Sequence, residues 1–473
     1  MIDAPTHKIA GALFAPQAYL PGGWCNNVLL EWDAQGLLTA VRSDVGAHTL
    51  HGRTEVSRAR GPVLPGMPNL HSHAFQSPMA GLTEYRGQAS NSFWSWRELM
   101  YRYAARISPE ALSAIAGQLY MDMLKAGYTS ACEFHYLHHR PDGRPYADRN
   151  EMGLSLIDAA ALTGLGMTFL PVLYQYSDFG ARPPRPDQAR FLNTPEQLLD
   201  MLVHLSGARP ESPQRRYGAA PHSLRAVSKD SLSVLLSGME QDFAGAPIHI
   251  HIAEQTAEVD VCMAVHGARP VQWLLDHYAV DSSWCLVHAT HIDTNETRAL
   301  AATGAVAGLC PTTEANLGDG IFPAAAYLDA GGQVGLGSDS HICVDWRSEL
   351  RLLEYGQRLL HRQRNVLASE HRPFVADRLF AAATQGGAQA GGLANGLLQV
   401  GRRADCLVLD LEHPALAGRH SDHWLSGIVF SERGQTPIKD VYAAGRCVVR
   451  DGRHIDEAAI TSRYLRVLAA LPQ

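Results

Sequence analysis

The segment PGMPNLHSH at residues 65–73 is the stretch from which the fold of this chain can be worked out. Successive side chains of a β-strand point to opposite faces, so His71 and His73 share one face while Ser72 points away. The segment therefore predicts a strand that ends in two converging imidazoles, a pattern suited to a metal site. Two structural histidines remain the alternative at this point, since a chain with 23 histidines among 473 residues contains about one such pair by chance.

Further β-rich segments follow along the chain and alternate with helical ones. This alternation predicts a parallel sheet with crossover helices, and eight strands is the number that a (β/α)8 barrel requires. Helix signals agree, because Ser108 precedes Pro109, Gly127 offers a stop, and Thr194 with Gln197 forms a capping box. The predicted strands are residues 65–73, 128–136, 167–175, 216–224, 247–254, 284–290, 305–312 and 333–340.

The two ends of the chain differ from this central part. Residues 1–62 and 397–473 contain short Val- and Leu-rich segments separated by turn signals, which is typical of β-structure. We therefore expect an α/β protein with a TIM-type barrel over residues 63–396. Both termini should together build one small β-sandwich, which residues 1–62 begin and residues 397–473 complete.

Composition narrows the classes of function. Hydrophobic residues make up 46% and charged residues 18% of the chain, which is ordinary for a globular protein with a sizeable core. The net charge of -7 provides no basic field for nucleic acid or anionic membranes. The eight cysteines form no dense framework, and no apolar run approaches the roughly 18 residues of a membrane span. These features predict a cytoplasmic protein that acts on a small molecule.

Polar residues recur where other predicted strands end. His251 ends the fifth strand, His288 the sixth and Asp339 the eighth. Since the carboxyl ends of barrel strands meet on one face, these side chains should converge with the histidine pair of the first strand. Imidazole and carboxylate donors suit Zn2+. The predicted zinc ligands are His71, His73, His251 and Asp339.

Glu254 is the predicted proton carrier, because it lies three residues after His251, where the strand gives way to a loop over the metal. Zinc lowers the pKa of a water toward about 7, and a nearby carboxylate can take its proton to a leaving nitrogen. We expect His288 and Asp339 to complete the catalytic group by stabilising developing charge. His249 lies one layer deeper in the strand and is interpreted as a core histidine.

The motifs NLHSHAFQ (residues 69–76) and LCPTTEANLGDG (residues 309–320) resemble the amidohydrolase superfamily and, within it, the formimidoylglutamate deiminase family. The resemblance extends over essentially the whole chain. It implies a mononuclear zinc hydrolase that converts N-formimino-L-glutamate and water to N-formyl-L-glutamate and ammonia during histidine degradation. Binuclear relatives carry a lysine at the end of the fourth strand, and none of Lys8, Lys125, Lys229 and Lys439 lies there, which favours one zinc per subunit.

A dicarboxylate substrate needs cations of fixed geometry in a protein of negative net charge, and arginine suits this best. Arg97 and Arg225 occupy suitable loops after the first and fourth strands, as does Arg86. The resemblance adds further substrate contacts, namely Gln76, Tyr136 and His222.

Two other functions stay open at this stage. One is another deaminase of the same superfamily that acts on guanine, cytosine or an adenosine derivative, whose site would favour stacking over paired arginines. The other is a barrel that has lost catalysis and serves as a scaffold, which would predict a broken ligand set. We expect a homodimer, since dimers are the commonest oligomers and the resemblance implies one.

Overall fold

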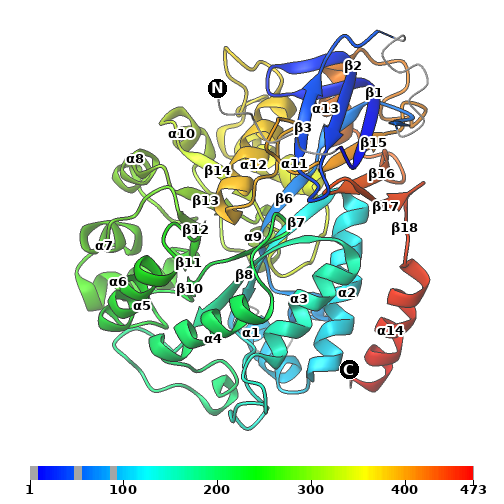
Figure 1. Ribbon diagram of the computed structural model, residues 1–473. Helices are drawn as coiled ribbons and strands as arrows, with labels where there is room; N and C mark the ends of the chain where they lie inside the picture. Colours follow the sequence, from blue (N-terminus) through cyan, green and yellow to red (C-terminus); the bar gives the residue numbers. More distant parts are fainter. Residues whose placement is uncertain (1–8, 47–55, 86–92, 472–473) are drawn as a thin grey trace, which may run out of the picture.

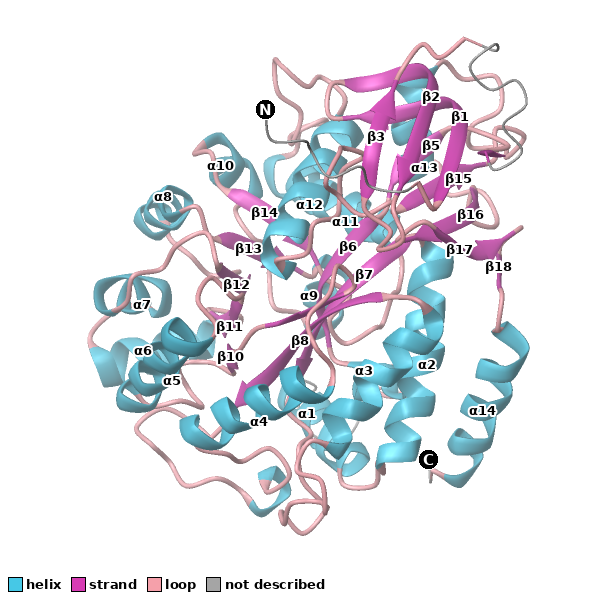
Figure 2. Cartoon of the chain, viewed as in Figure 1, coloured by secondary structure: helices cyan, strands magenta, loops and turns pink. Residues whose placement is uncertain are grey.

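A computed structural model describes residues 9–46, 56–85 and 93–471 of the chain. Parallel strands occupy the centre and helices surround them, while a further sheet lies at the top of the view (Figures 1 and 2). The central strands are β6 (Met67–Ser72), β7 (Tyr128–His135), β8 (Gly166–Leu173), β9 (Arg215–Tyr217), β10 (Ala220–Pro221), β11 (Ile248–Ile252), β12 (Trp284–His288), β13 (Val306–Leu309) and β14 (Gln333–Leu336).

The central strands form two parallel sheets. One has the order β10-β8-β7-β6 with β9 beside β8, and the other has the order β11-β12-β13-β14. Isolated parallel bridges join Ala219 to Ile248 and Ser72 to Asp339, so the sheets approach each other at both edges. The alternation of parallel strands and helices that the sequence predicts is therefore confirmed as a TIM-barrel-type arrangement.

The helices begin and end where the sequence signals indicate. Ser108 accepts a hydrogen bond from the N–H of Ala111, and Gly127 ends that helix with φ 96°. The capping box of Thr194 and Gln197 is also present. The helices are α1 (Phe93–Ala104), α2 (Pro109–Ala126), α3 (Glu151–Thr163), α4 (Pro195–Ala208), α5 (Lys229–Asp242), α6 (Thr256–His266), α7 (Pro270–His277), α8 (Thr294–Thr303), α9 (Pro311–Leu317), α10 (Ala324–Asp329), α11 (Trp346–His361), α12 (Val375–Gly391), α13 (Trp424–Phe430) and α14 (Glu457–Ala470).

Strands from both ends of the chain share one nine-stranded sheet. Its members are β1 (Gly11–Leu20), β2 (Gly23–Trp32), β3 (Leu38–Arg42), β4 (Val56–Arg58), β5 (Val63–Pro65), β15 (Cys406–Leu409), β16 (Ile438–Ala443), β17 (Arg446–Arg450) and β18 (Arg453–His454). The predicted start of the first central strand at residue 65 is wrong, because Pro65 pairs with Cys406 in this sheet. Gly66 lies between β5 of this sheet and β6 of the central part. A larger residue would clash there, because a Cβ atom would lie 2.2 Å from Thr129 Oγ1.

All eight predicted strands extend too far at their carboxyl ends. The excess is one or two residues in the first three, and the predicted strand 216–224 is two short strands, of which the second ends at Pro221. The last four end at Ile252, His288, Leu309 and Leu336 rather than at residues 254, 290, 312 and 340. Ala253, Ala289 and Asp339 have φ values of 51°, 47° and 46°, and this left-handed backbone ends a strand. Glu254 and Asp339 therefore lie on turns beyond the strands, whereas His251 and His288 lie within them.

The C-terminal part also contains helices, whereas the sequence indicated only β-structure there. In Figure 1, α14 (red) runs beside α2, and Lys125 Nζ lies 3.1 Å from Glu457 Oε1. Thr461 Oγ1 donates a hydrogen bond to Gln118 Oε1 at 3.1 Å. The end of the chain is thus packed onto the outside of the central part.

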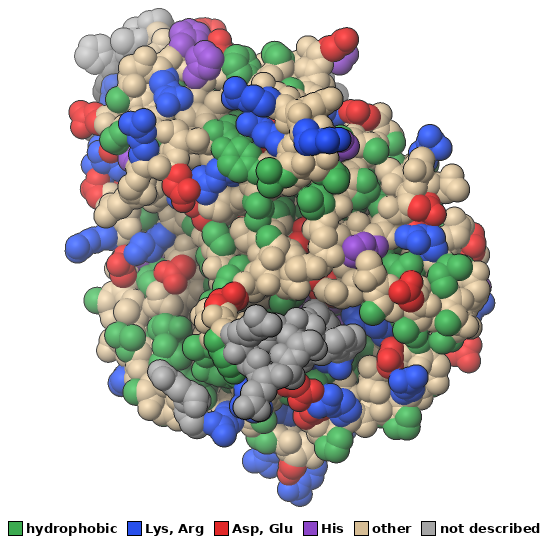
Figure 3. Space-filling view, turned by 180° about the vertical axis from the view of Figure 1, so that it is seen from behind, with side chains coloured by type: hydrophobic (Ala, Val, Ile, Leu, Met, Phe, Trp, Pro, Cys, Tyr) green, Lys and Arg blue, Asp and Glu red, His purple; other side chains and the backbone are tan. Residues whose placement is uncertain are grey.

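On the face seen in Figure 3, Lys and Arg side chains are intermixed with Asp and Glu side chains. On that face the surface therefore carries no extended region of positive or of negative charge. Within residues 9–46, 56–85 and 93–471, we find no helix with the length and apolar character needed to cross a bilayer.

Candidate metal centre and active site

Four buried side chains from distant parts of the chain meet at the carboxyl ends of the strands. His71 lies in β6, His73 directly follows it, His251 lies in β11, and Asp339 follows β14. One ligand atom from each lies within 4.8 Å of the others. The Nε2 atom of His71 is 3.0 Å from Nε2 of both His73 and His251, and Asp339 Oδ1 is 3.3 Å from His73 Nε2. The predicted convergence is therefore present in the structure.

The hydrogen bonds of the imidazole Nδ1 atoms, which point away from the centre, determine what this group can bind. His73 Nδ1 donates to the carbonyl of Phe134 at 2.8 Å, and His251 Nδ1 donates to that of His222 at 3.1 Å. A carbonyl only accepts, so the Nε2 atoms of both rings carry lone pairs toward the centre. Burial, together with the neighbouring histidines, lowers the pKa of His251 well below its ordinary value. Burial also lowers the pKa of His73 to about 3.

Lone pairs that face one another at such distances need a cation between them. Donors at the Zn–N distance, in a tetrahedral arrangement, lie about 3.3 Å apart. Four of the six donor separations lie between 3.0 Å, for His71 and His73, and 3.6 Å, for His71 Nε2 and Asp339 Oδ1, which brackets that value, and all six lie within 4.8 Å. The group therefore fits a tetrahedral divalent ion of the zinc type.

The loop that carries Asp339 is held against the first strand. Asp339 N donates to the carbonyl of His71 at 3.0 Å. Asn69 donates from Nδ2 to Ser338 Oγ at 2.6 Å and accepts from Ser338 N at 3.1 Å. Asp339 itself has φ 46°, a backbone conformation that costs energy and is maintained only where surrounding contacts fix it.

Glu254 and His288 stand beside the ligand group. His288 Nε2 lies 3.8 Å from Glu254 Oε1 and 3.6 Å from Asp339 Oδ2. The Glu254 N–H donates to Glu258 Oε2 at 3.0 Å, which fixes the turn after β11. The three predicted catalytic side chains thus surround one point next to the metal ligands.

Glu314 orients His288, and the sequence reasoning gave it no role. Its Oε1 lies 3.2 Å from His288 Nδ1 and accepts the N–H of Cys310 at 2.8 Å. Burial alone would lower the pKa of His288, but the carboxylates of Glu254, Glu314 and Asp339 outweigh it and raise that pKa to about 10. Glu314 belongs to the motif at residues 309–320, so a signal was present.

Glu133 is a second residue that the sequence reasoning missed. Its Oε2 accepts hydrogen bonds from Ser72 Oγ at 2.7 Å and Tyr120 OH at 3.0 Å, and its Oε1 accepts from Ala74 N at 2.7 Å. The carboxylate therefore holds the chain on both sides of His73. Glu133 is the one acidic residue in the segment YTSACEFH at residues 128–135, and this was the available signal.

The predicted substrate contacts all line one cavity, together with the ligand group. Gln76 Nε2 donates to Tyr136 OH at 2.7 Å on one wall. Arg225 lies on another wall, with Nη2 3.8 Å from Glu254 Oε2. Lining residues include the ligands His73, His251 and Asp339, the neighbours Glu254 and His288, and the predicted contacts Gln76, Arg97, Tyr136, His222 and Arg225. Arg86 lies outside the described residues.

The remaining walls of this cavity are largely aromatic, with Tyr174 and Phe191 among them. The rings of Tyr174 and His222 lie 4.6 Å apart. Burial and the charges of Arg225 and Arg97 lower the pKa of His222 well below its ordinary value. Arg97 and Arg225 thus bring positive charge into this cavity although the chain has a net charge of -7, and they lie there beside the carboxylates of Glu254 and Asp339.

Comparison with known proteins agrees with this architecture and site. The amidohydrolase family model matches residues 63–448, and the chain belongs to this family. Within it, the chain is similar to the formimidoylglutamate deiminase of Pseudomonas aeruginosa, with 51% identity over 97% of this chain and 99% of that protein.

Other relatives are more distant. A 5-methylthioadenosine/S-adenosylhomocysteine deaminase of Natronomonas pharaonis is 27% identical over 86% of both chains. Among solved structures, an amidohydrolase from Brucella melitensis has a TM-score of 0.89 and 43% identity, with 98% of this chain and 99% of that chain covered. An adenosine deaminase from Xanthomonas campestris with bound zinc has a TM-score of 0.77 at 21% identity over 97% and 98%, and it supports the fold alone.

Proposed function

We propose that this chain hydrolyses N-formimino-L-glutamate to N-formyl-L-glutamate and ammonia in histidine degradation. The observation that carries the proposal is that Arg97 and Arg225 line the same cavity as the metal-type ligand group and Glu254. Identity of 51% to a formimidoylglutamate deiminase over nearly the full length supports the same substrate.

The proposal includes one zinc ion per chain, held by His71, His73, His251 and Asp339. Bound zinc would supply a Lewis acid that lowers the pKa of water. The donor set of three imidazoles and one carboxylate supports this metal. The lack of a lysine at the end of the fourth strand supports a single ion.

Each polar group beside the ligands has a proposed part in the reaction. Glu254 takes one proton from the attacking water at a carboxylate oxygen and gives it to the terminal nitrogen; the second water proton passes to the same nitrogen as the C=O bond forms, so that this nitrogen leaves as ammonia. His288 donates to the oxygen attached to the tetrahedral carbon, where negative charge develops, and Asp339 accepts a hydrogen bond from that attacking oxygen. The C–N bond to the terminal nitrogen breaks and a C=O bond forms, so the product keeps its formyl group.

The substrate's two carboxylates require cations with fixed geometry. We assign these to Arg97 and Arg225, whose guanidinium groups can each form two parallel hydrogen bonds with a carboxylate. Gln76, Tyr136 and His222 complete the contacts, and the hydrogen bond from Gln76 to Tyr136 keeps that wall in one conformation.

Ammonia release by the zinc-loaded protein tests the substrate directly. N-formimino-L-glutamate should be the best substrate, N-formimino-L-aspartate should react poorly because its second carboxylate is one methylene closer, and guanine should not react. Release from guanine without release from N-formimino-L-glutamate would assign the chain to a purine deaminase, for which the aromatic walls offer stacking surfaces. Release from none of them would favour a scaffold without catalysis.

Some finer parts of the proposal concern architecture and assembly. We propose that the two central sheets close into one (β/α)8 barrel over residues 63–396, and the isolated bridges at both edges support this. The sheet that residues 1–62 and 397–473 form together with β5 would then be a separate small sandwich domain. A homodimer in the cytoplasm stays a prediction, which the oligomeric state in solution and fractionation of cells would test.

A further inference from the structure

Two phenol side chains on the wall of the active-site cavity have no part in the proposed reaction. Tyr101 of α1 and Tyr174, which follows β8, line this cavity together with Arg97 and Arg225. We call Tyr101 and Tyr174 the tyrosine pair. Gln188, which is fully buried in the loop after β8, donates a hydrogen bond to each of their hydroxyls. The three side chains therefore form one hydrogen-bonded unit.

The contacts of the Gln188 amide allow only one orientation of this group. Its Oε1 accepts from the N–H of Arg185 at 2.8 Å, and a backbone N–H can only donate. Nε2 is therefore the atom beside the tyrosine pair, and it donates to Tyr101 OH at 3.1 Å and to Tyr174 OH at 2.8 Å. Each phenol oxygen thus accepts one of the two amide hydrogens.

The bonds from Gln188 determine what the hydroxyls can still do. A phenol oxygen that accepts a hydrogen bond keeps its own hydrogen as a donor. Among the described residues, neither hydroxyl donates outside this unit. The two hydroxyls can use at most one hydrogen on each other, so at least one is left for a ligand. Burial and the neighbouring Tyr101 raise the pKa of Tyr174, so its hydroxyl keeps its hydrogen at neutral pH.

The surroundings of the tyrosine pair suit a carboxylate. The guanidinium carbon of Arg97 lies 5.8 Å from the ring centre of Tyr101. The charges of Arg225 and Arg97 both lower the pKa of the Tyr174 hydroxyl, against the larger effect of burial. A hydroxyl donor near guanidinium groups favours an anion with two acceptor oxygens, because hydrogen bonds to a charged acceptor are about twice as strong as those to a neutral one.

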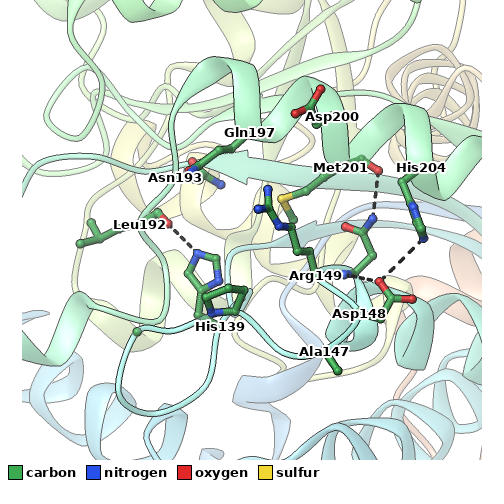
Figure 4. Close-up of a pocket in the computed structure, with 13 residues that line it drawn as sticks. His139, Ala147, Asp148, Arg149, Leu192, Asn193, Gln197, Asp200, Met201 and His204 are labelled. Carbon is green, nitrogen blue, oxygen red and sulfur yellow. Dashed lines mark hydrogen bonds and ion pairs between the residues drawn. The ribbon is translucent and has the colours of Figure 1, made fainter.

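The loop that carries Gln188 is anchored on its other side. Leu192 and Asn193 line a different cavity, of ≈ 590 Å³, where the carbonyl of Leu192 accepts from His139 Nε2 at 2.7 Å (Figure 4). Arg190 donates from Nε to the carbonyl of His139 at 2.7 Å and from Nη2 to that of Ile107 at 2.9 Å. These bonds tie the loop to the segment after β7 and to the connection between α1 and α2. Gln188 is thus held in place relative to the cavity wall.

Tyr174 lies one ring farther from the ligand group than two of the predicted substrate contacts. The ring of Tyr136 lies 5.3 Å from that of His73, and the ring of His222 lies 5.0 Å from that of His251. The ring of Tyr174 in turn lies 4.6 Å from that of His222. The tyrosine pair is therefore placed to meet a part of the substrate that is remote from the reacting carbon.

We propose that the tyrosine pair, held by Gln188, binds the side-chain carboxylate of the substrate together with Arg97 and so selects dicarboxylates over substrates with a neutral side chain. The assignment rests on the proposed function for the identity of the substrate. The α-carboxylate is attached to the same carbon as the formimino nitrogen, so it stays near Arg225, whose Nη2 lies 3.8 Å from Glu254 Oε2. The side-chain carboxylate is farther from the reacting carbon and reaches the tyrosine pair. Gln188 is a positioning residue, since it acts through the two hydroxyls.

Calorimetric titration of the zinc-loaded, intact protein with two stable ligands tests the site without turnover. N-formyl-L-glutamate carries both carboxylates, whereas N-formyl-L-glutamine has a neutral amide of the same size in place of the side-chain carboxylate. We expect N-formyl-L-glutamate to bind about tenfold or more tightly, as for hydrogen bonds to a charged group.

Gln188→Glu keeps the size of the side chain and an acceptor for the N–H of Arg185, but it offers an oxygen to the tyrosine pair. The hydroxyl hydrogens then turn toward this carboxylate and away from the ligand. The variant should bind N-formyl-L-glutamate about tenfold more weakly and should change the affinity for N-formyl-L-glutamine much less. The double variant Tyr101→Phe/Tyr174→Phe removes the hydroxyls but keeps both rings, and it should lower the same ratio of affinities.

Tyr146→Phe is the matched control, because the Tyr146 hydroxyl accepts from Arg190 at 3.3 Å and lies outside the described lining of the cavity. Both affinities should be unchanged in this variant. Equal affinity of the unmodified protein for the two ligands would overturn the proposal, as would no saturable binding of N-formyl-L-glutamate up to about 10 mM. An unchanged ratio of affinities in Gln188→Glu or in the double variant would overturn it as well, since a merely structural role would weaken both ligands equally.

Failure of the proposed function gives a different result. The expected ratios in a protein that releases no ammonia from N-formimino-L-glutamate would retain the carboxylate site and reject the reaction. Ammonia release together with an unchanged ratio in Gln188→Glu would retain the reaction and reject the carboxylate site.

Discussion

Glu314 holds His288 through the same oxygen that accepts a backbone hydrogen bond from Cys310. The His288 Nδ1 atom lies 3.2 Å from Glu314 Oε1, and the Cys310 N–H donates to that oxygen at 2.8 Å. One nitrogen of the ring is thus fixed by a carboxylate that is itself fixed by the backbone. The other nitrogen faces Glu254 and Asp339.

Glu314→Gln should lower kcat at alkaline pH more than at neutral pH. The Glu314 carboxylate is among the groups that raise the pKa of His288 to about 10, so its removal lowers that pKa. A protonated His288 is then lost at a lower pH, and the alkaline limb of the profile of kcat against pH moves to lower pH. Glu240→Gln, at an exposed position of α5, is the control and should leave the profile in place. An unchanged alkaline limb in Glu314→Gln would contradict this role.

Glu254→Gln should retain metal and lose activity. Glutamine keeps the size of the side chain but cannot carry a proton, and general acid–base groups contribute roughly 10²–10⁴-fold to rate. Metal content and kcat measured on the same preparation check this, again with Glu240→Gln as the control. Near-normal turnover would remove Glu254 from the mechanism.

Metal analysis should find one zinc per chain, and its removal should lower Tm. Without the ion, His71 Nε2 lies 3.0 Å from the Nε2 atoms of His73 and His251 and 3.6 Å from Asp339 Oδ1 with no cation between them. A ligand present at 100 times its Kd stabilises the native state by about 2.7 kcal/mol. Thermal unfolding before and after chelation measures the change, and His71→Ala should show little response to added zinc. Two ions per chain would contradict the single site.

Arg225→Gln should lower kcat/KM for N-formimino-L-glutamate by about 10- to 100-fold, the effect of losing a hydrogen bond between charged groups. Arg97→Gln should act similarly if each arginine binds one carboxylate. Arg209→Gln, which removes an exposed pair with Asp158, serves as the control. Equal kcat/KM values in all three variants would show that the carboxylates bind elsewhere.

Stability should fall as the pH drops below about 6.5, and His138 should contribute to the loss. Burial and the neighbouring His139 lower the pKa of His138 to about 3. The unfolded chain therefore takes up a proton between about pH 6.5 and 3 that the folded chain does not, at about 1.4 kcal/mol per pH unit. His138→Gln can keep the bond to the Val172 carbonyl, which His138 makes at 3.0 Å, without titrating. Its free energy of unfolding, measured at pH 7 and 5, should depend less on pH than that of the unmodified protein.

The strand pattern carried enough information to place the main polar residues. A period of two residues put His71 and His73 on one face, and the rule that parallel strands end at the same edge brought His251 and Asp339 to them. These rules depend only on position within an element. They therefore work from sequence alone.

Contacts between elements could not be predicted in the same way. The hydrogen bond from Ser72 to Glu133 joins residues far apart in sequence. The periodicity of a sequence does not indicate which donor a buried carboxylate will contact. The ends of the strands were also missed, because the left-handed backbone of Ala253 and Asp339 is stabilised by surrounding contacts rather than by residue type.

The pairing of β5 with β15 has a consequence for how the polypeptide matures during synthesis. Val63 of β5 pairs with Val408 of β15. β5 is therefore synthesised early, whereas β15 leaves the ribosome only after all the central strands. Until then the edge of β5 is exposed and open to pairing with other nascent chains. Translation must therefore approach its end before this edge is protected, and mutations that weaken β15 should promote aggregation of newly made protein before they affect the finished enzyme.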